Sequence, residues 1–155
     1  MNNVINYNEL RELAVKAGKA IPRLACIKIQ DGKAYFTNTR YLVIMEGYKN
    51  TDDCVMNMDN YKKSELDYPN LDAIINQDFN SAEFEKAILD DKVVYKVNNC
   101  CVDNEIITQL KKLIAIENYT VDVNNFKINK NGHVAKLELP DGSAIIIALK
   151  FYRNK

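Results

Sequence analysis

Residues 24–38 of the chain read LACIKIQDGKAYFTN, and this pattern predicts a β-hairpin. Polar and apolar side chains alternate on both sides of Asp31-Gly32, a dipeptide typical of two-residue hairpin turns. A two-residue turn pairs Gln30 with Lys33 and fixes the register of both strands. That register places four apolar side chains on one face: Ile27, Ile29, Ala34 and Phe36.

The elements on either side of this hairpin are a helix and a third strand. Residues 8–20 repeat apolar side chains at spacings of three and four, which predicts an amphipathic helix that Asn6 or Asn8 caps. Residues 40–46 are almost continuously apolar and predict a buried strand.

The second half of the chain repeats this order. A very regular apolar stripe predicts a helix over residues 103–116, with Asp103 as its N-cap. Asn131-Gly132 then predicts a second hairpin, in which Ile128 faces Ala135. The strands expected here cover residues 119–123, 126–130, 133–139 and 143–151.

The region between the two halves, residues 47–92, is less regular. We expect a strand over residues 54–58, a turn at 68–70, a capped helix over 81–89 and an extended segment over 92–97.

Together these elements predict one α+β domain over residues 1–155. Its half-units, about 1–46 and 93–151, would be related by a pseudo-twofold βαβββ repeat, with two helices on one side of antiparallel sheets. An ordinary two-layer α+β sandwich fits the same pattern.

The composition narrows the class of function. Hydrophobic residues make up 47% of the 155 and charged residues 27%, which is typical of a globular protein. Lys plus Arg (21) equals Asp plus Glu (21), so only a local basic patch would attract nucleic acid. The sequence has neither a signal-peptide pattern nor an apolar run long enough for a bilayer. We therefore expect a cytoplasmic protein with reduced cysteines and no membrane partner.

Catalytic residues are poorly represented, so we expect a non-enzymatic protein without a cofactor or a metal. His133 is the single histidine and follows a turn, and none of the three serines lies in a nucleophile motif. Cys100-Cys101 lack the spacing of a zinc site, and we interpret them as small buried residues.

Three segments resemble bacterial β sliding clamps, the processivity clamps of DNA polymerases. They are residues 21–42, with an Ile-Pro-Arg-Leu entry before the first hairpin, residues 68–75 (YPNLDAII), and the apolar end at residues 141–150. The resemblance covers most of the chain in the right order. It implies a clamp-like DNA-replication accessory protein whose two helices face duplex DNA, encoded by a phage or another mobile element.

The resemblance also implies where partners would bind. Basic side chains on and beside the two predicted helices would contact phosphates: Arg11, Lys16, Lys19, Arg23, Lys111 and Lys112. Tyrosine is enriched in protein interfaces, and three of the nine would suit a protein partner: Tyr41, Tyr68 and Tyr152. Ordinary solvated helix faces and tyrosines at the edge of the core explain the same residues.

Two biochemical roles remain open from the sequence. The first is a replication accessory protein. Because a clamp ring contains six such domains, this role requires the chain to form a homo-oligomer around DNA. In the alternative, a phage-type clamp-fold protein binds and inhibits a host nucleic-acid enzyme without touching DNA. The neutral net charge favours the alternative, and the extent of the resemblance favours replication.

Overall fold

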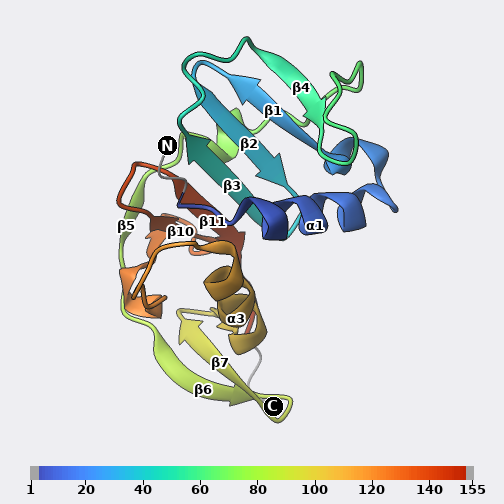
Figure 1. Cartoon of the computed structure of the whole chain (residues 1–155). Helices are drawn as coiled ribbons and strands as arrows, with labels where there is room; N and C mark the ends of the chain where they lie inside the picture. The colour runs from blue at the N-terminus through green and yellow to red at the C-terminus, as the bar shows by residue number, and fades with distance from the viewer. Residues whose placement is uncertain (1–3, 153–155) are drawn as a thin grey trace.

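Figure 1 shows the computed structural model of the chain, which describes residues 4–152. The helices and strands within these residues have the following bounds: α1 Tyr7–Gly18, β1 Cys26–Gln30, β2 Lys33–Thr37, β3 Tyr41–Glu46, β4 Cys54–Asn57, α2 Asp72–Ile75, β5 Phe79–Ser81, β6 Glu85–Leu89, β7 Lys92–Val97, β8 Cys100–Asp103, α3 Asn104–Leu113, β9 Lys127–Asn129, β10 Val134–Glu138, β11 Ala144–Ala148 and β12 Lys150–Phe151. Short 3₁₀ helices cover Pro22–Ala25 and Val123–Asn125.

The strands form two sheets. Eight strands pair in the order β4-β1-β2-β3-β11-β10-β9-β5, and four pair in the order β12-β8-β7-β6. Every strand pairing within residues 4–152 is antiparallel. This confirms the predicted α+β class with antiparallel sheets.

Helices α1 and α3 pack on the same face of the eight-stranded sheet. Leu10 and Ala14 of α1 and Leu110 of α3 are fully buried, and they belong to one apolar core with side chains from β1, β2, β3, β10 and β11. Figure 1 shows both helices on one side of these strands. The Asn6 side chain caps α1, as predicted, by accepting a hydrogen bond from the Glu9 N–H at 3.2 Å.

The other face of the sheet is covered by the segment that contains α2. Because side chains alternate along a strand, Leu42, Ile44 and Ile146 point away from α1 and α3. They form a second, smaller apolar cluster with Leu71, against which the partly buried Tyr68 packs. Both faces of the central strands β3 and β11 are therefore buried, which explains their nearly continuous apolar sequences.

Both predicted hairpins are confirmed. Asp31 and Gly32 have φ values of 52° and 81°, and Ile29 lies opposite Ala34 as the two-residue turn requires. In the second hairpin Ile128 lies opposite Ala135, again as predicted.

The helix predicted over residues 81–89 is wrong. Residues 85–89 form strand β6, which pairs along its whole length with β7. Asp90 and Asp91 make the turn, with φ values of 50° and 63°. An Asp-Asp turn carries a weaker hairpin signal than Asp-Gly, and the pairing with β7 outweighs the helix propensity of Ala, Glu and Lys.

Two other predicted strands differ from the structure. Residues 119–122 form no strand, and a 3₁₀ helix begins at Val123, where Asp122 accepts a hydrogen bond from the Asn124 N–H at 2.9 Å. The strand predicted over residues 143–151 is divided at Leu149, so β11 belongs to the large sheet and β12 to the small one. The Leu149 N–H donates to the carbonyl of His133, the residue before β10, at 2.8 Å.

The end of α3 meets the start of α1. Helix α3 ends at Leu113, three residues earlier than predicted, and Ile114 pairs with Ile5 in an antiparallel bridge. The Asn6 N–H also donates to the Leu113 carbonyl at 2.7 Å. Because the first turn of α1 and the last turn of α3 are joined in this way, the two helices have a fixed relation on the sheet.

Candidate nucleic-acid interface

Five of the six predicted phosphate-binding residues are exposed. Lys16 lies in the last turn of α1, Lys19 caps that helix and Arg23 follows in the 3₁₀ helix. Lys111 and Lys112 lie in the last turn of α3. None of the five has an ion-pair partner within 4.0 Å among residues 4–152. Basic side chains at helix C-termini also interact favourably with the helix dipole, which explains part of this placement.

These cations form two groups rather than one patch. Lys111 and Lys112 end the helix that meets the start of α1, whereas Lys16, Lys19 and Arg23 lie at and beyond the other end of α1. Helix α1 has 12 residues and is therefore about 18 Å long at 1.5 Å per residue. On a duplex with a rise of about 3.4 Å per base pair, the length of α1 corresponds to about five base pairs.

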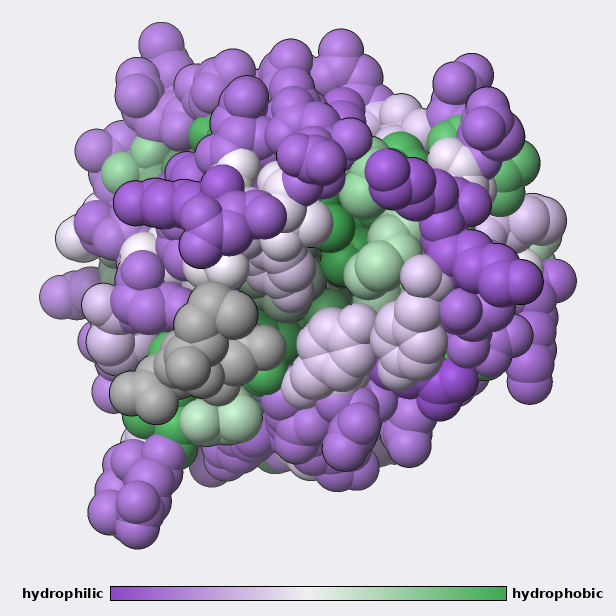
Figure 2. Space-filling model, turned by 45° about the horizontal axis from the view of Figure 1, so that its top comes forward, coloured by the Kyte–Doolittle hydropathy of each residue, from purple (hydrophilic) through white to green (hydrophobic). Residues whose placement is uncertain are grey.

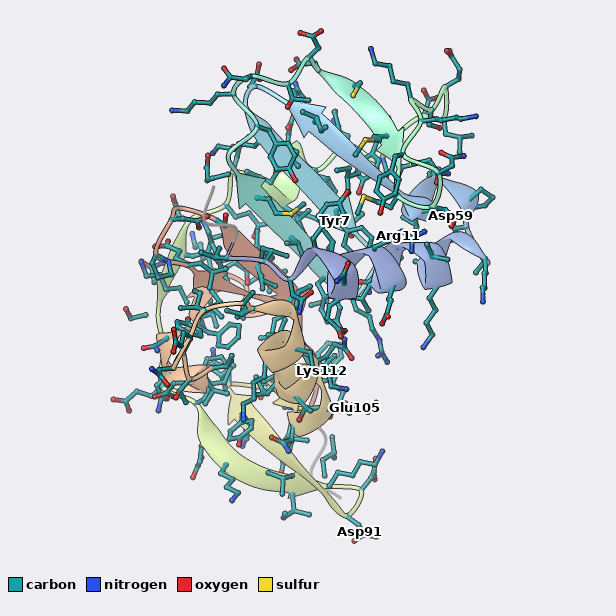
Figure 3. All side chains as sticks on the ribbon, in the orientation of Figure 1. Tyr7, Arg11, Asp59, Asp91, Glu105 and Lys112 are labelled. Carbon is teal, nitrogen blue, oxygen red and sulfur yellow. The ribbon has the colours of Figure 1, made fainter. Side chains whose placement is uncertain are left out.

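Acidic side chains lie on the same helices. Glu12 precedes Lys16 by one turn of α1, and Glu105 precedes Lys112 by two turns of α3. Figure 3 shows Glu105 and Lys112 projecting from the same side of α3. The local charge is therefore mixed, with a small excess of cations toward the helix ends.

The sixth residue, Arg11, makes hydrogen bonds to the loop after β4. Its Nε donates to the Met58 carbonyl at 3.0 Å, and its Nη2 lies 3.1 Å from the Asp59 carbonyl and 3.4 Å from Asp59 Oδ1. The guanidinium also lies 5.6 Å from the centre of the Tyr61 ring. Figure 3 shows Arg11 directed toward Asp59 and away from Lys112. Arg11 thus holds α1 against the loop after β4, and it is not one of the unpaired cations proposed to contact phosphates.

The three tyrosines predicted to bind a protein do not share a surface. Tyr41 is only 5% exposed and lies in the main core, so it is not available to a partner. Tyr68 accepts a hydrogen bond from the Thr37 N–H at 2.9 Å, and burial raises the pKa of its phenol. Tyr152 is half-buried on the small sheet, where Lys96 Nζ lies 4.9 Å from its ring centre.

A cluster of Tyr7, Tyr61 and Met58 was not predicted from the sequence. The Tyr7 and Tyr61 rings stack with their centres 6.4 Å apart, and the Tyr7 hydroxyl donates to Met58 Sδ at 3.7 Å. Tyr61 is 52% exposed. On the face of the molecule seen at 45° to the view of Figure 1, apolar and weakly polar side chains gather between hydrophilic ones (Figure 2). A contact between residues 54 apart carries no local sequence signal.

The cysteines and the histidine form no group of three or more metal ligands within residues 4–152. Cys100 Sγ lies 3.9 Å from His133 Nδ1, but Cys100 is only 4% exposed and burial raises the pKa of its thiol. Burial likewise raises the pKa of Cys101, and all four cysteines are free. The raised pKa of Cys100 and Cys101 favours the protonated thiol, which is a weak nucleophile.

The chain was also compared with known proteins. No family model, curated protein or solved structure matches it. Among residues 4–152, no helix has the length and hydrophobicity needed to cross a bilayer.

Proposed function

We propose that the chain is a non-enzymatic DNA-replication accessory protein with a sliding-clamp-like domain that contacts duplex DNA through α1 and α3. The observation that carries this proposal is that both helices cover the same face of one antiparallel sheet. Their exposed ends present five basic side chains that have no acidic partner among residues 4–152. Such side chains can replace the counterions of DNA phosphates.

The order of the strands supports a clamp-like arrangement of two units. In the first unit α1 is followed by β1, β2 and β3, and in the second α3 is followed by β9, β10 and β11. The units meet where β3 pairs with β11, and the order β1-β2-β3 is mirrored by β9-β10-β11. The edge strands depart from this symmetry, because β4 follows the first unit whereas β5 precedes the helix of the second. The small sheet departs from it too, because Ile5 forms only a bridge where the second unit has a complete strand, β8, before its helix.

The contact with DNA would be independent of base sequence. Lysine and arginine side chains at helix ends reach phosphates, and phosphate contacts position a protein without reading bases. The two cation groups lie near opposite ends of α1, which is about 18 Å long, so one chain would contact phosphates several base pairs apart. In the clamp resemblance a ring contains six such domains, so encirclement requires association of six chains.

Duplex binding tests this proposal. We expect Lys16→Glu combined with Lys111→Glu to weaken binding of a 20-base-pair duplex at least tenfold at low salt, because each group loses one cation and gains one anion. Lys130→Glu, on the exposed turn between β9 and β10, is the matched control and should bind like the wild type. Equal binding by the wild type, the double variant and the control would refute a DNA role for α1 and α3.

A second function is favoured by the zero net charge and by the Tyr7–Tyr61 stack beside Arg11. Tyrosine and arginine are enriched in the residues that dominate protein interfaces. A clamp-fold protein of phage type would use such a surface to bind and inhibit a host nucleic-acid enzyme. Size-exclusion chromatography with light scattering separates the two roles. A ring of six 17.8 kDa chains has a mass of about 107 kDa, whereas a monomer or dimer makes encirclement impossible and supports the inhibitor.

A further inference from the structure

A hollow of about 380 Å³ opens to solvent between α3 and the β6–β7 hairpin. Three elements line it: α3, the hairpin and the segment that leads to the second 3₁₀ helix. The apolar part of its surface comes from Ile107, Val121 and Val123, together with the rings of Phe84 and Tyr95. Its volume lies in the range of about 300–1,000 Å³ found for ligand sites in proteins, and its lining combines these apolar and aromatic side chains with polar ones.

The local structure directs these side chains into the hollow. Lys86 and Tyr95 lie directly opposite each other on β6 and β7, so both point to the same side of the hairpin. On α3, Asn104, Ile107 and Lys111 follow at spacings of three and four and share one face of the helix. The hollow therefore has one wall from a helix and one from a sheet.

Phe84 is held in place at the edge of the hollow. Its N–H donates to Asn124 Oδ1 at 3.3 Å, and its ring packs edge-on against the buried Phe126 with the centres 6.3 Å apart. The aromatic part of the lining is therefore ordered before any ligand binds, which lowers the entropic cost of binding.

The charges of the lining favour an anion. Lys86 and Lys111 have no ion-pair partner within 4.0 Å among the described residues. Asp122 is the one carboxylate of the lining, and its Oδ1 already accepts the hydrogen bond from the Asn124 N–H at 2.9 Å. Asn104 and Thr120 add uncharged polar groups to the lining.

From this lining we infer that the hollow binds a nucleoside monophosphate unit, with the base against Tyr95 and Phe84 and the phosphate at Lys86 and Lys111. A base has the flat apolar faces that aromatic side chains bind, and the phosphate supplies the negative charge. The unit can come from a free nucleotide or from an unpaired nucleotide of a strand. This inference does not rest on duplex binding by the helix ends.

Calorimetric titration with the full chain tests the site. The probes are 5′-AMP, adenosine and a 5′-phosphorylated trideoxyadenylate. We expect 5′-AMP or the trinucleotide to bind, and adenosine to bind at least fivefold more weakly because it lacks the phosphate. Binding of the trinucleotide without 5′-AMP assigns the site to strands, and binding of 5′-AMP assigns it to free nucleotides.

Variants locate the binding in the hollow. Lys86→Glu lies on an exposed position and Thr120→Trp fills the hollow from an exposed position, so neither disturbs the core. Each should weaken binding at least fivefold, and Tyr95→Ala should weaken it about 5- to 150-fold, the range measured for loss of one base–aromatic stack. Lys130→Glu, at an exposed position outside the lining and outside the set proposed to contact duplex DNA, is the control and should have no effect.

The inference is overturned if neither 5′-AMP nor the trinucleotide binds, if adenosine binds as well as 5′-AMP, or if Lys86→Glu and Thr120→Trp bind like the wild type. Failure of the wild type to bind a duplex leaves these readouts unchanged, because neither Lys86 nor Thr120 belongs to the set proposed to contact duplex DNA.

Discussion

The N–H of Asn6 donates a hydrogen bond to the carbonyl of Leu113 at 2.7 Å, and this bond joins the start of α1 to the end of α3. Asn6 is also the N-cap of α1. Its side chain therefore caps the first helix, while its N–H binds the last residue of α3. The end of α3, with its cations, is thereby held at the start of α1, and the other cations lie toward and beyond the far end of α1. The proposed contact with DNA depends on this relation between the helices.

Arg11→Met should lower the free energy of unfolding by about 1–3 kcal/mol, because the Met58 and Asp59 carbonyls lose a charged donor. Methionine keeps most of the apolar stem, so the loss reports the hydrogen bonds. Urea denaturation measures it, with Lys19→Met as the exposed control. Duplex affinity should fall no further in Arg11→Met than in Lys130→Met. A larger loss of affinity would return Arg11 to the phosphate-binding set.

Tyr68→Phe should cost about 1–2 kcal/mol, because the Thr37 N–H loses the phenol oxygen that accepts its hydrogen bond at 2.9 Å. Burial raises the pKa of Tyr68 in the folded protein, so its stabilising effect is fully present below pH 10 and is lost as pH rises through the higher folded pKa. Tyr35→Phe, half-buried on β2, is the control. Equal stabilities of the two variants in urea at pH 7 would contradict the role of the hydroxyl.

Asp103→Asn should remove the ion pair between Asp103 Oδ1 and Lys150 Nζ, which are 2.7 Å apart. The hydrogen bond to Asp103 raises the pKa of Lys150, so the stabilisation is present below pH 10.5 and is lost as pH rises through the folded pKa. The Lys150 side chain is 51% exposed, which limits the expected loss at pH 7 to about 0.5–1 kcal/mol. Glu138→Gln, which removes two longer pairs, with Lys127 at 3.6 Å and Lys136 at 4.0 Å, should change less. A difference between wild type and Asp103→Asn that grows above pH 10.5 would show that the pair has been misassigned.

Thiol reactivity should follow burial. Cys54 is half-exposed on the edge strand β4, whereas Cys26, Cys100 and Cys101 are buried. In native protein at pH 7 we expect iodoacetamide to modify Cys54 first and the other three only after local opening, because burial keeps Cys100 and Cys101 protonated. Peptide mass spectrometry over time measures the order. Faster modification of Cys100 than of Cys54 would indicate that His133 activates it.

Local signals account for the parts of the fold that the sequence predicts. Asp31, Gly32 and Gly132 supply the positive φ values of the two hairpin turns, and the apolar stripe of α3 identifies its buried face. Residues 85–89 were mispredicted because their state is decided by pairing with β7 across an unusual Asp-Asp turn. Strand β8 was missed for a related reason, since its pairing with β7 and β12 is not visible in four residues.

The candidate site was predictable only in part. Exposure of the lysines follows from the helical period, which places them opposite the apolar stripe. The hydrogen bonds of Arg11 could not be predicted from the neighbouring sequence, because its partners lie 47 and 48 residues away in the chain. The hollow beside α3 could not be predicted either, because Lys86 and Tyr95 lie opposite each other only when residues 85–89 form a strand.

The salt dependence of duplex binding tests the central claim most directly. Fluorescence anisotropy of a labelled 20-base-pair duplex gives the binding constant K at salt concentrations from about 25 to 200 mM. The slope of log K against log salt then reports the counterions released on binding. If the five free cations contact phosphates, the wild-type slope should be about −4 to −5, and Lys16→Glu with Lys111→Glu should reduce its magnitude by about 2 while Lys130→Glu leaves it unchanged. A slope that is the same in all three proteins, or no binding by the wild type at 25 mM salt, would contradict the account.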